Sequence, residues 1–171
     1  MAGYLSQLSP NVKGISKISV QTGATHGGVV LPDGSISKVK LDFKTLEELS
    51  KSAREEYGMG GAVQHGASTL PLDMFEMFPQ TSTLEVHMGM GFQNLIYDNQ
   101  HFPNKLLNII YKYILKNYAS ERKQEDTEEQ FLYKNRGRAF GDFKKEIWGI
   151  PEKNLIEIMN TLEDRFSLIF Q

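Results

Sequence analysis

The central segment of this sequence reads Gly61-Ala62-Val63-Gln64-His65-Gly66-Ala67-Ser68-Thr69. A short apolar run ends in a histidine, and a loop of small residues with two hydroxyl groups follows it. A buried strand brings its last side chain to the edge of a sheet in this way, and glycine lets the backbone approach whatever the histidine binds. The segment therefore predicts a strand followed by a binding loop.

The same arrangement occurs twice more in the chain. Residues 18–28 read Ile-Ser-Val-Gln-Thr-Gly-Ala-Thr-His-Gly-Gly, and residues 84–89 read Leu-Glu-Val-His-Met-Gly. His26, His65 and His87 thus each follow a strand-like run and shortly precede a glycine. The intervals between them leave room for crossover helices, which indicates βα units with parallel strands. Ligands gather at the carboxyl ends of such strands, where we expect all three histidines.

The composition excludes several classes of protein. The chain has 171 residues, no cysteine and a formal net charge of −2 from 19 basic and 21 acidic side chains. It therefore predicts neither a nucleic-acid partner nor a thiolate metal site nor an oxidising compartment. Residues 1–13 lack the pattern of a signal peptide, and no apolar run approaches the roughly 18 residues of a membrane span. We expect a cytoplasmic protein without a membrane partner.

The first part of the chain predicts strands that alternate with helices. Strands are expected at residues 15–20, 61–64 and 83–88, where apolar residues alternate or cluster. Thr45 and Glu48 have the spacing of a capping box, so a helix should begin near Thr45 and end at Gly58. A short helix is expected over residues 71–78, with proline in its first turn.

After residue 98 the pattern becomes helical. Apolar residues recur at helical spacing over residues 104–118, a second capping box joins Thr127 to Gln130, and Pro151 opens a last helix. The basic and aromatic residues near Tyr133 and Arg136 could bind phosphate, but a half-buried helix with cations reaching solvent explains them better. We therefore expect two domains, residues 1–98 and residues 99–171, with the second packed on the first.

The histidines admit two interpretations. Neutral imidazole is a common zinc ligand, and catalytic zinc sites have about three protein ligands and one open position. Exposed backbone N–H groups after each histidine, together with Ser68 and Thr69, suit a phosphate. This layout fits a phosphorylated substrate with a carbonyl group. Alternatively, the histidines are ordinary core or rim residues that bond to backbone, and His101 is a surface residue.

These residues resemble the class II fructose-bisphosphate aldolases, metal-dependent (β/α)8-barrel enzymes of cytosolic sugar metabolism and glycolysis. His26-Gly27 resembles the family's first His-Gly pair, and residues 65–69 resemble its His-Gly-Gly-Ser-Gly loop with two small-residue changes. The resemblance implies that His26 and His65 are zinc ligands. It implies that Gly27, Gly66 and Ser68, with Ala67 in the same loop, hold the substrate phosphate. It also places Gly27 and Gly66 near a monovalent cation.

The resemblance covers about residues 15–98, the last three strands of the family's barrel. It implies an α/β fold: a partial (β/α)8 TIM-type barrel of three βα units, followed by an all-helical C-terminal extension. The family's Asn-x-Asp motif is replaced here by His87-Met88-Gly89, and nothing matches its remaining zinc histidine or its proton-transferring aspartate. We expect the chain alone to be inactive, and to act as a homo-oligomer or with the missing N-terminal half of the barrel.

Three functions remain open from the sequence. The first is a zinc-dependent aldehyde-lyase that cleaves a ketose bisphosphate reversibly when its site is complete. The second is a non-catalytic phosphosugar-binding or scaffolding subunit that keeps the fold without the acid-base residues. The third is a metal-binding sheet protein unrelated to aldolases, in which His87 completes a three-histidine site.

Overall fold

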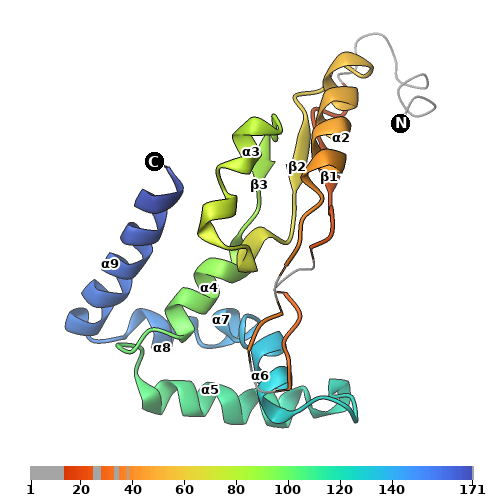
Figure 1. The fold of residues 1–171 in the computed structure, drawn as a ribbon. Helices are drawn as coiled ribbons and strands as arrows, with labels where there is room; N and C mark the ends of the chain where they lie inside the picture. Colours follow the sequence, from red (N-terminus) through yellow and green to blue (C-terminus); the bar gives the residue numbers. More distant parts are fainter. Residues whose placement is uncertain (1–13, 25–27, 33–34, 38, 171) are drawn as a thin grey trace. The chain divides into compact units, whose positions relative to one another are not determined.

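The computed structural model describes residues 14–24, 28–32, 35–37 and 39–170. The chain forms two compact units. Unit 1 comprises residues 1–26 and 38–88, and unit 2 comprises residues 27–37 and 89–171. The division of the sequence into domains at residue 98 stays a prediction. Figure 1 shows the elements of both units in sequence colours.

Unit 1 is built on a three-stranded parallel sheet in the order β1-β2-β3. The strands are short: β1 spans Ile18–Val20, β2 spans Ala62–Gln64 and β3 spans Glu85–Val86. Each lies inside a strand predicted from the sequence, and both pairings are parallel as expected. The alternation of apolar residues placed these strands correctly because side chains along a strand point to opposite faces in turn.

Helix α2 (Phe43–Glu55) connects β1 to β2 and contributes Leu46 and Ala53 to the core. The predicted capping box at Thr45 is wrong. Asp42 is the N-cap, and its carboxylate accepts the Thr45 N–H at 3.0 Å and the Thr45 hydroxyl at 2.7 Å. The helix therefore begins two residues earlier than expected. Gly58 adopts the left-handed conformation predicted for it, with φ of 64°.

The connection from β2 to β3 contains three short helical turns rather than one helix over residues 71–78. These are η1 (Ala67–Thr69), η2 (Leu72–Met74) and α3 (Met77–Gln80). Their apolar side chains, with α2, cover one face of the sheet and form a core cluster. Its buried members are Ala24, Leu41, Leu46, Ala62, Ala67, Leu70 and Phe78.

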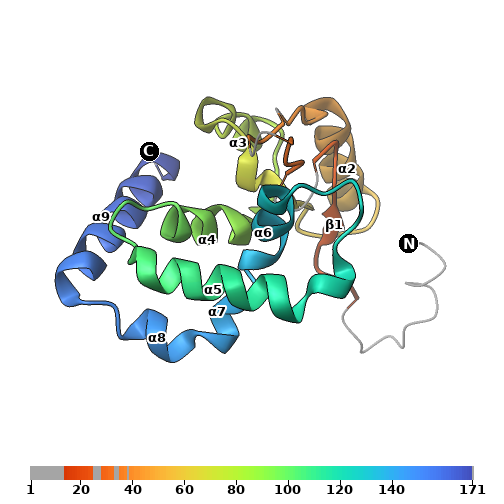
Figure 2. The same ribbon diagram turned by 90° about the horizontal axis from the view of Figure 1, so that it is seen from below.

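Unit 2 is helical apart from an isolated antiparallel bridge between Val30 and Ile36. Its helices are α4 (Gly89–Tyr97), α5 (Asn104–Asn117), η3 (Ala119–Glu121), α6 (Glu128–Arg136), α7 (Ala139–Asp142), α8 (Lys144–Trp148) and α9 (Glu152–Ile169). Helix α5 lies against α6, and α4 lies against α9 (Figure 1, Figure 2). The helices predicted after residue 104 are confirmed, whereas α4 was missed because two glycines interrupt its apolar pattern.

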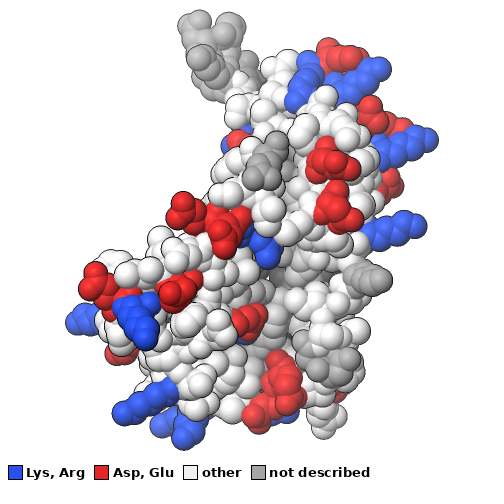
Figure 3. Space-filling model, turned by 60° about the vertical axis from the view of Figure 1, so that its left-hand side comes forward, with Lys and Arg blue, Asp and Glu red and all other residues white. Residues whose placement is uncertain are grey.

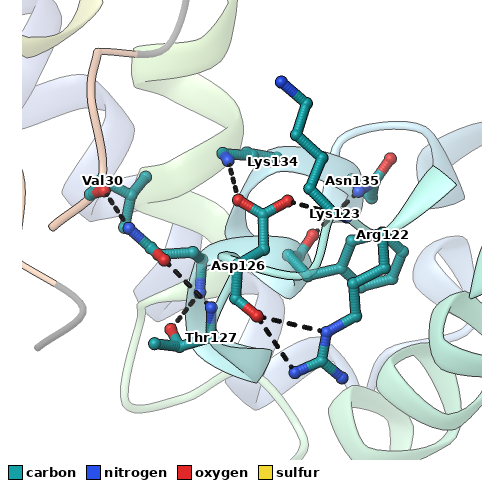
Figure 4. A network of polar contacts seen from close by, with 9 residues as sticks. Val30, Arg122, Lys123, Asp126, Thr127, Lys134 and Asn135 are labelled. Carbon is teal, nitrogen blue, oxygen red and sulfur yellow. Dashed lines mark hydrogen bonds and ion pairs between the residues drawn. The ribbon is translucent and has the colours of Figure 1, made fainter. Parts of the chain in front are cut away.

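The apolar core of unit 2 is separate from that of unit 1. Its buried members are Tyr97, Phe102, Ile110, Ile114, Phe131, Leu132, Ala139, Ile150 and Ile158. The capping box of α6 is present as predicted: Thr127 Oγ1 accepts the Gln130 N–H, and Gln130 Oε1 accepts the Thr127 N–H. Gln130 also donates to the Val30 carbonyl, and Lys134 pairs with Asp126 beside it (Figure 4).

The expected partial (β/α)8 barrel is wrong. Helices make up 56% of the described residues, and the only sheet among these residues has three short strands. After β3 the chain does not return to the sheet in its described part, because α4 to α9 bury their apolar faces against one another instead. The sheet face opposite α2 carries Lys17, Glu85 and His87, whereas a barrel interior is filled with bulky branched side chains.

Candidate functional site

The strand register brings two of the predicted histidines together. Gln64 pairs with Val86, so His65 and His87 are the next residues on adjacent strands. The His65 N–H donates to the Val20 carbonyl at 3.1 Å, and the His87 N–H donates to the Gln64 carbonyl at 3.0 Å. Side chains at matching positions of neighbouring strands share a face. The two imidazole rings accordingly lie 4.4 Å apart between centroids, with their planes at 56°.

A carboxylate and an ammonium group lie on the same face of the sheet. Glu85 Oε2 contacts His87 Nε2 at 3.2 Å, and Glu85 Oε1 forms an ion pair with Lys17 Nζ. Lys17 is the residue before β1, and Glu85 lies on β3, so this ion pair reaches across the middle strand β2. The hydrogen bond from Lys17, followed by the one with His87, holds the pKa of the Glu85 carboxyl below its usual range. Glu85 is therefore ionised at neutral pH and accepts from both neighbours.

The opposite face of the strand ends is fixed by a buried amide. Gln64 is fully buried, and its Oε1 accepts a hydrogen bond from the Thr22 hydroxyl at 2.9 Å. Its Nε2 donates to the His65 carbonyl at 2.5 Å. Buried polar groups that are fully hydrogen-bonded rigidify their surroundings. Gln64 thus ties the carboxyl end of β1 to the residue that carries the imidazole on β2.

The loop after His65 has the backbone geometry expected of a tight turn. Gly66 has φ of 78°, a left-handed conformation that favours glycine, and it opens the 3-10 helix η1. Ala67 is fully buried in the core of unit 1, whereas Ser68 is half-buried. The Thr69 hydroxyl is buried and has no hydrogen-bond partner in the described part of the chain. Buried hydroxyl groups in proteins usually bond to protein, to ordered water or to a ligand.

The predicted site residues divide into two groups. His65, His87, Gly66, Ala67 and Ser68 lie together at the carboxyl ends of β2 and β3. His26 and Gly27, which the resemblance assigned to zinc and phosphate, lie outside the described residues. The described residues contain no group of three or more histidine, aspartate or glutamate side chains that could hold a metal ion.

Sequence reasoning missed Glu85, Lys17 and Gln64 as parts of this site. Glu85 could have been found, because it lies two residues before His87 on a strand and therefore on the same face. Lys17 could not, since its contact with Glu85 depends on the order of the strands in the sheet. His101 lies in unit 2, where its ring contacts the Gln100 side chain at 3.2 Å.

The basic and aromatic region of unit 2 is part of the helical fold, but the Arg136 cation is buried rather than reaching solvent as the sequence predicted. Arg136 is 4% exposed, and it donates to Asp98 through two nitrogens at 2.5 and 2.7 Å. It also donates to Asn94 and lies over the Tyr133 ring at 4.7 Å. On the face shown in Figure 3, lysine and arginine side chains are interspersed with aspartate and glutamate side chains. Arg136 thus joins α6 to α4 and to the residue that follows it.

Comparisons with known proteins add no family assignment. No protein-family model, curated protein or solved structure matches this chain. None of the helices in the described part of the chain has the length and apolar character needed to cross a membrane. Function is therefore inferred from the residues at the strand ends.

Proposed function

We propose that the carboxyl edge of the sheet in unit 1 binds a divalent metal ion, zinc in the first place, beside a phosphorylated sugar. In a complete site this edge would serve a lyase of the class II aldolase type, which cleaves a ketose bisphosphate such as fructose 1,6-bisphosphate reversibly. The observation that carries the proposal is the pair of imidazoles at the ends of β2 and β3. We place this activity in cytoplasmic carbohydrate metabolism.

The donor set fits two positions of a metal site. His65 is half-buried at a strand end, and a second imidazole lies beside it. Catalytic zinc sites have about three protein ligands, and by the aldolase resemblance His26 would supply another. A zinc ion held there would act as a Lewis acid toward a substrate carbonyl group.

The loop after His65 supports a phosphate subsite. Gly66 turns the backbone sharply, and the Ser68 side chain and the orphaned Thr69 hydroxyl follow within the same turn. Hydroxyl and backbone N–H groups in such a turn can donate to a phosphate oxygen. By the resemblance, Gly27 would contribute to the same phosphate, and Gly27 with Gly66 would lie near a monovalent cation.

In this proposal the residues of the chain bind and orient the metal ion and the phosphorylated sugar. The described residues include no acid-base group placed for carbon–carbon cleavage. Glu85 is the carboxylate nearest to the histidines among them, and it is engaged by Lys17 and His87. This observation favours a second candidate function, a non-catalytic phosphosugar-binding or scaffolding subunit. We propose that cleavage needs groups beyond this chain, supplied by another copy or by a separate polypeptide.

The test measures zinc and phosphosugar binding by the full chain. Calorimetry should give one zinc site that the His65→Ala variant weakens by at least tenfold, because one of few protein ligands is lost. Dihydroxyacetone phosphate should bind more weakly after a chelator removes the metal. Phosphosugar binding that a chelator leaves unchanged would establish the second candidate. Aldol cleavage by this chain alone would contradict the claim that further groups are needed.

A further inference from the structure

We infer that His87 is a second metal ligand of the proposed site and that Glu85, held by Lys17, is the residue that positions it. The inference rests on the proposed function, because it concerns the same metal ion. It goes beyond the aldolase resemblance, which assigns no role to His87. Its support is a continuous set of contacts from Lys17 to Glu85, His87 and His65.

The distance between the imidazoles decides whether they can share one ion. With Zn–N bonds of 2.0–2.1 Å and tetrahedral angles, two ligating imidazole rings have centroids about 5 Å apart. The observed separation of 4.4 Å is shorter than that value, so the rings would have to turn apart to ligate one ion. Small rotations of the two side chains would bring a nitrogen of each to the ion. Because the rings come from matching positions of adjacent strands, they lie on the same face of the sheet.

Glu85 determines which nitrogen of His87 faces the metal. Its Oε2 lies 3.2 Å from Nε2, so an Nε2–H group donates to the carboxylate and Nδ1 is left as the ligating nitrogen. Metal-ligating histidines usually donate their other ring N–H to a carboxylate or a carbonyl, which fixes the tautomer and the ring orientation. Lys17 fixes Glu85 in turn through the other carboxylate oxygen.

Stability alone explains this arrangement poorly. The Lys17 and Glu85 side chains are 44% and 37% exposed, and an exposed ion pair contributes about 0–1 kcal/mol to folding. The contact with His87 is similarly exposed, since that side chain is 50% accessible. A positioning role accounts for a carboxylate placed against the imidazole that lies beside His65.

The test titrates the full chain with Co²⁺ alone, whose visible absorption reports nitrogen ligation. His87→Ala should weaken binding by at least tenfold. Glu85→Ala should weaken it by about 10–100-fold, the usual effect of removing a carboxylate that orients a ligand. Glu85→Gln should restore part of the affinity, because its amide oxygen can still accept the Nε2–H. His101→Ala, on a histidine of unit 2, should bind as the unaltered chain does.

A metal-free measurement separates the inference from the proposed function. Nitrogen chemical shifts of His87 should show the Nε2–H tautomer in the unaltered chain and a mixture of tautomers in Glu85→Ala. Equal Co²⁺ affinity in His87→Ala, with binding lost in His65→Ala, would overturn the inference and leave a metal site that depends on His65 but not on the pair of imidazoles. Absence of Co²⁺ binding by the unaltered chain would overturn both. An unchanged tautomer in Glu85→Ala would overturn the positioning role of Glu85.

Discussion

The two units place their polar side chains differently. In unit 2 the buried Arg136 is enclosed by Asp98, Asn94 and aromatic rings, and its hydrogen bonds join helices to one another. In unit 1 the buried polar groups tie strand ends to the loops that leave them, and two imidazoles remain at the sheet edge. Polar groups thus join the helices of unit 2, whereas in unit 1 they fix the ends of the strands that carry the two imidazoles.

The first prediction tests whether the two apolar cores are independent. Phe131→Ala, at a residue 1% exposed in unit 2, should reduce the free energy of unfolding by about 3–5 kcal/mol. Leu46→Ala, at a fully buried residue in unit 1, should cost about 2–5 kcal/mol. Hydrogen exchange should show each loss mainly in the amides of its own unit, such as Ile110 and Val63.

Phe170→Ala is the control for the first prediction. This side chain is 81% exposed, so its removal should change the free energy of unfolding by at most about 0.5 kcal/mol. If Leu46→Ala accelerates exchange in unit 2 as much as in unit 1, the two cores unfold as one. The two units would then not be independent in their unfolding.

The second prediction concerns a buried hydroxyl in unit 1. Ser50 Oγ accepts the Ala62 N–H at 3.0 Å and donates to the Ser82 carbonyl at 2.9 Å. Ser50→Ala should cost about 1–3 kcal/mol in urea unfolding, because it leaves a buried N–H without a partner. Ser52→Ala is the matched control, since that hydroxyl makes no hydrogen bond with the described residues. Equal losses of unfolding free energy in both variants would contradict the role assigned to the Ser50 hydroxyl.

The third and smallest effect is the pH dependence of the α2 cap. The Asp42 carboxyl has a lowered pKa, first because it accepts the backbone N–H of Thr45 and then because it accepts the Thr45 hydroxyl. A lowered pKa in the folded state contributes stability above the unfolded value of 3.8, and this is lost as the pH falls through the folded pKa. The stability difference between the unaltered chain and Asp42→Ala should therefore shrink below about pH 4.

Urea unfolding between pH 2.5 and pH 7 measures this effect. The difference between Asp42→Ala and Asp42→Asn serves as the internal control, because neither variant has a carboxyl group at that position. That difference should not change with pH. A constant difference between the unaltered chain and Asp42→Ala over the whole range would show that the charged cap contributes nothing.

The local elements were largely predictable, and the fold class was not. Alternating apolar residues located β1 and β3, a short apolar run located β2, and the Thr127–Gln130 spacing located the start of α6. The cap of α2 was misplaced because Asp42 competes with Thr45 for the same role and lies at the better position. The predicted barrel was wrong because three strand-like segments do not reveal whether later segments of the chain return to the sheet.

The site was predictable only in part, for a related reason. The sequence placed His65 and His87 at strand ends and Gly66 in a turn, because each depends on residues nearby in the chain. The separation of the two rings and the contact of Lys17 with Glu85 depend on register and strand order. The contact between Lys17 and Glu85 joins residues that are 68 positions apart in the chain.

The sequence by itself determined the positions of the strands, the helices after residue 104 and the segment from Gly61 to Thr69 as a strand followed by a turn. These follow from side-chain periodicity and local backbone preferences, which act over a few residues. Only the tertiary structure decided that the helices after β3 form their own core, and that His87 lies beside His65 with Glu85 against it. Such arrangements depend on packing between distant segments, where burial of apolar surface selects one pairing among many.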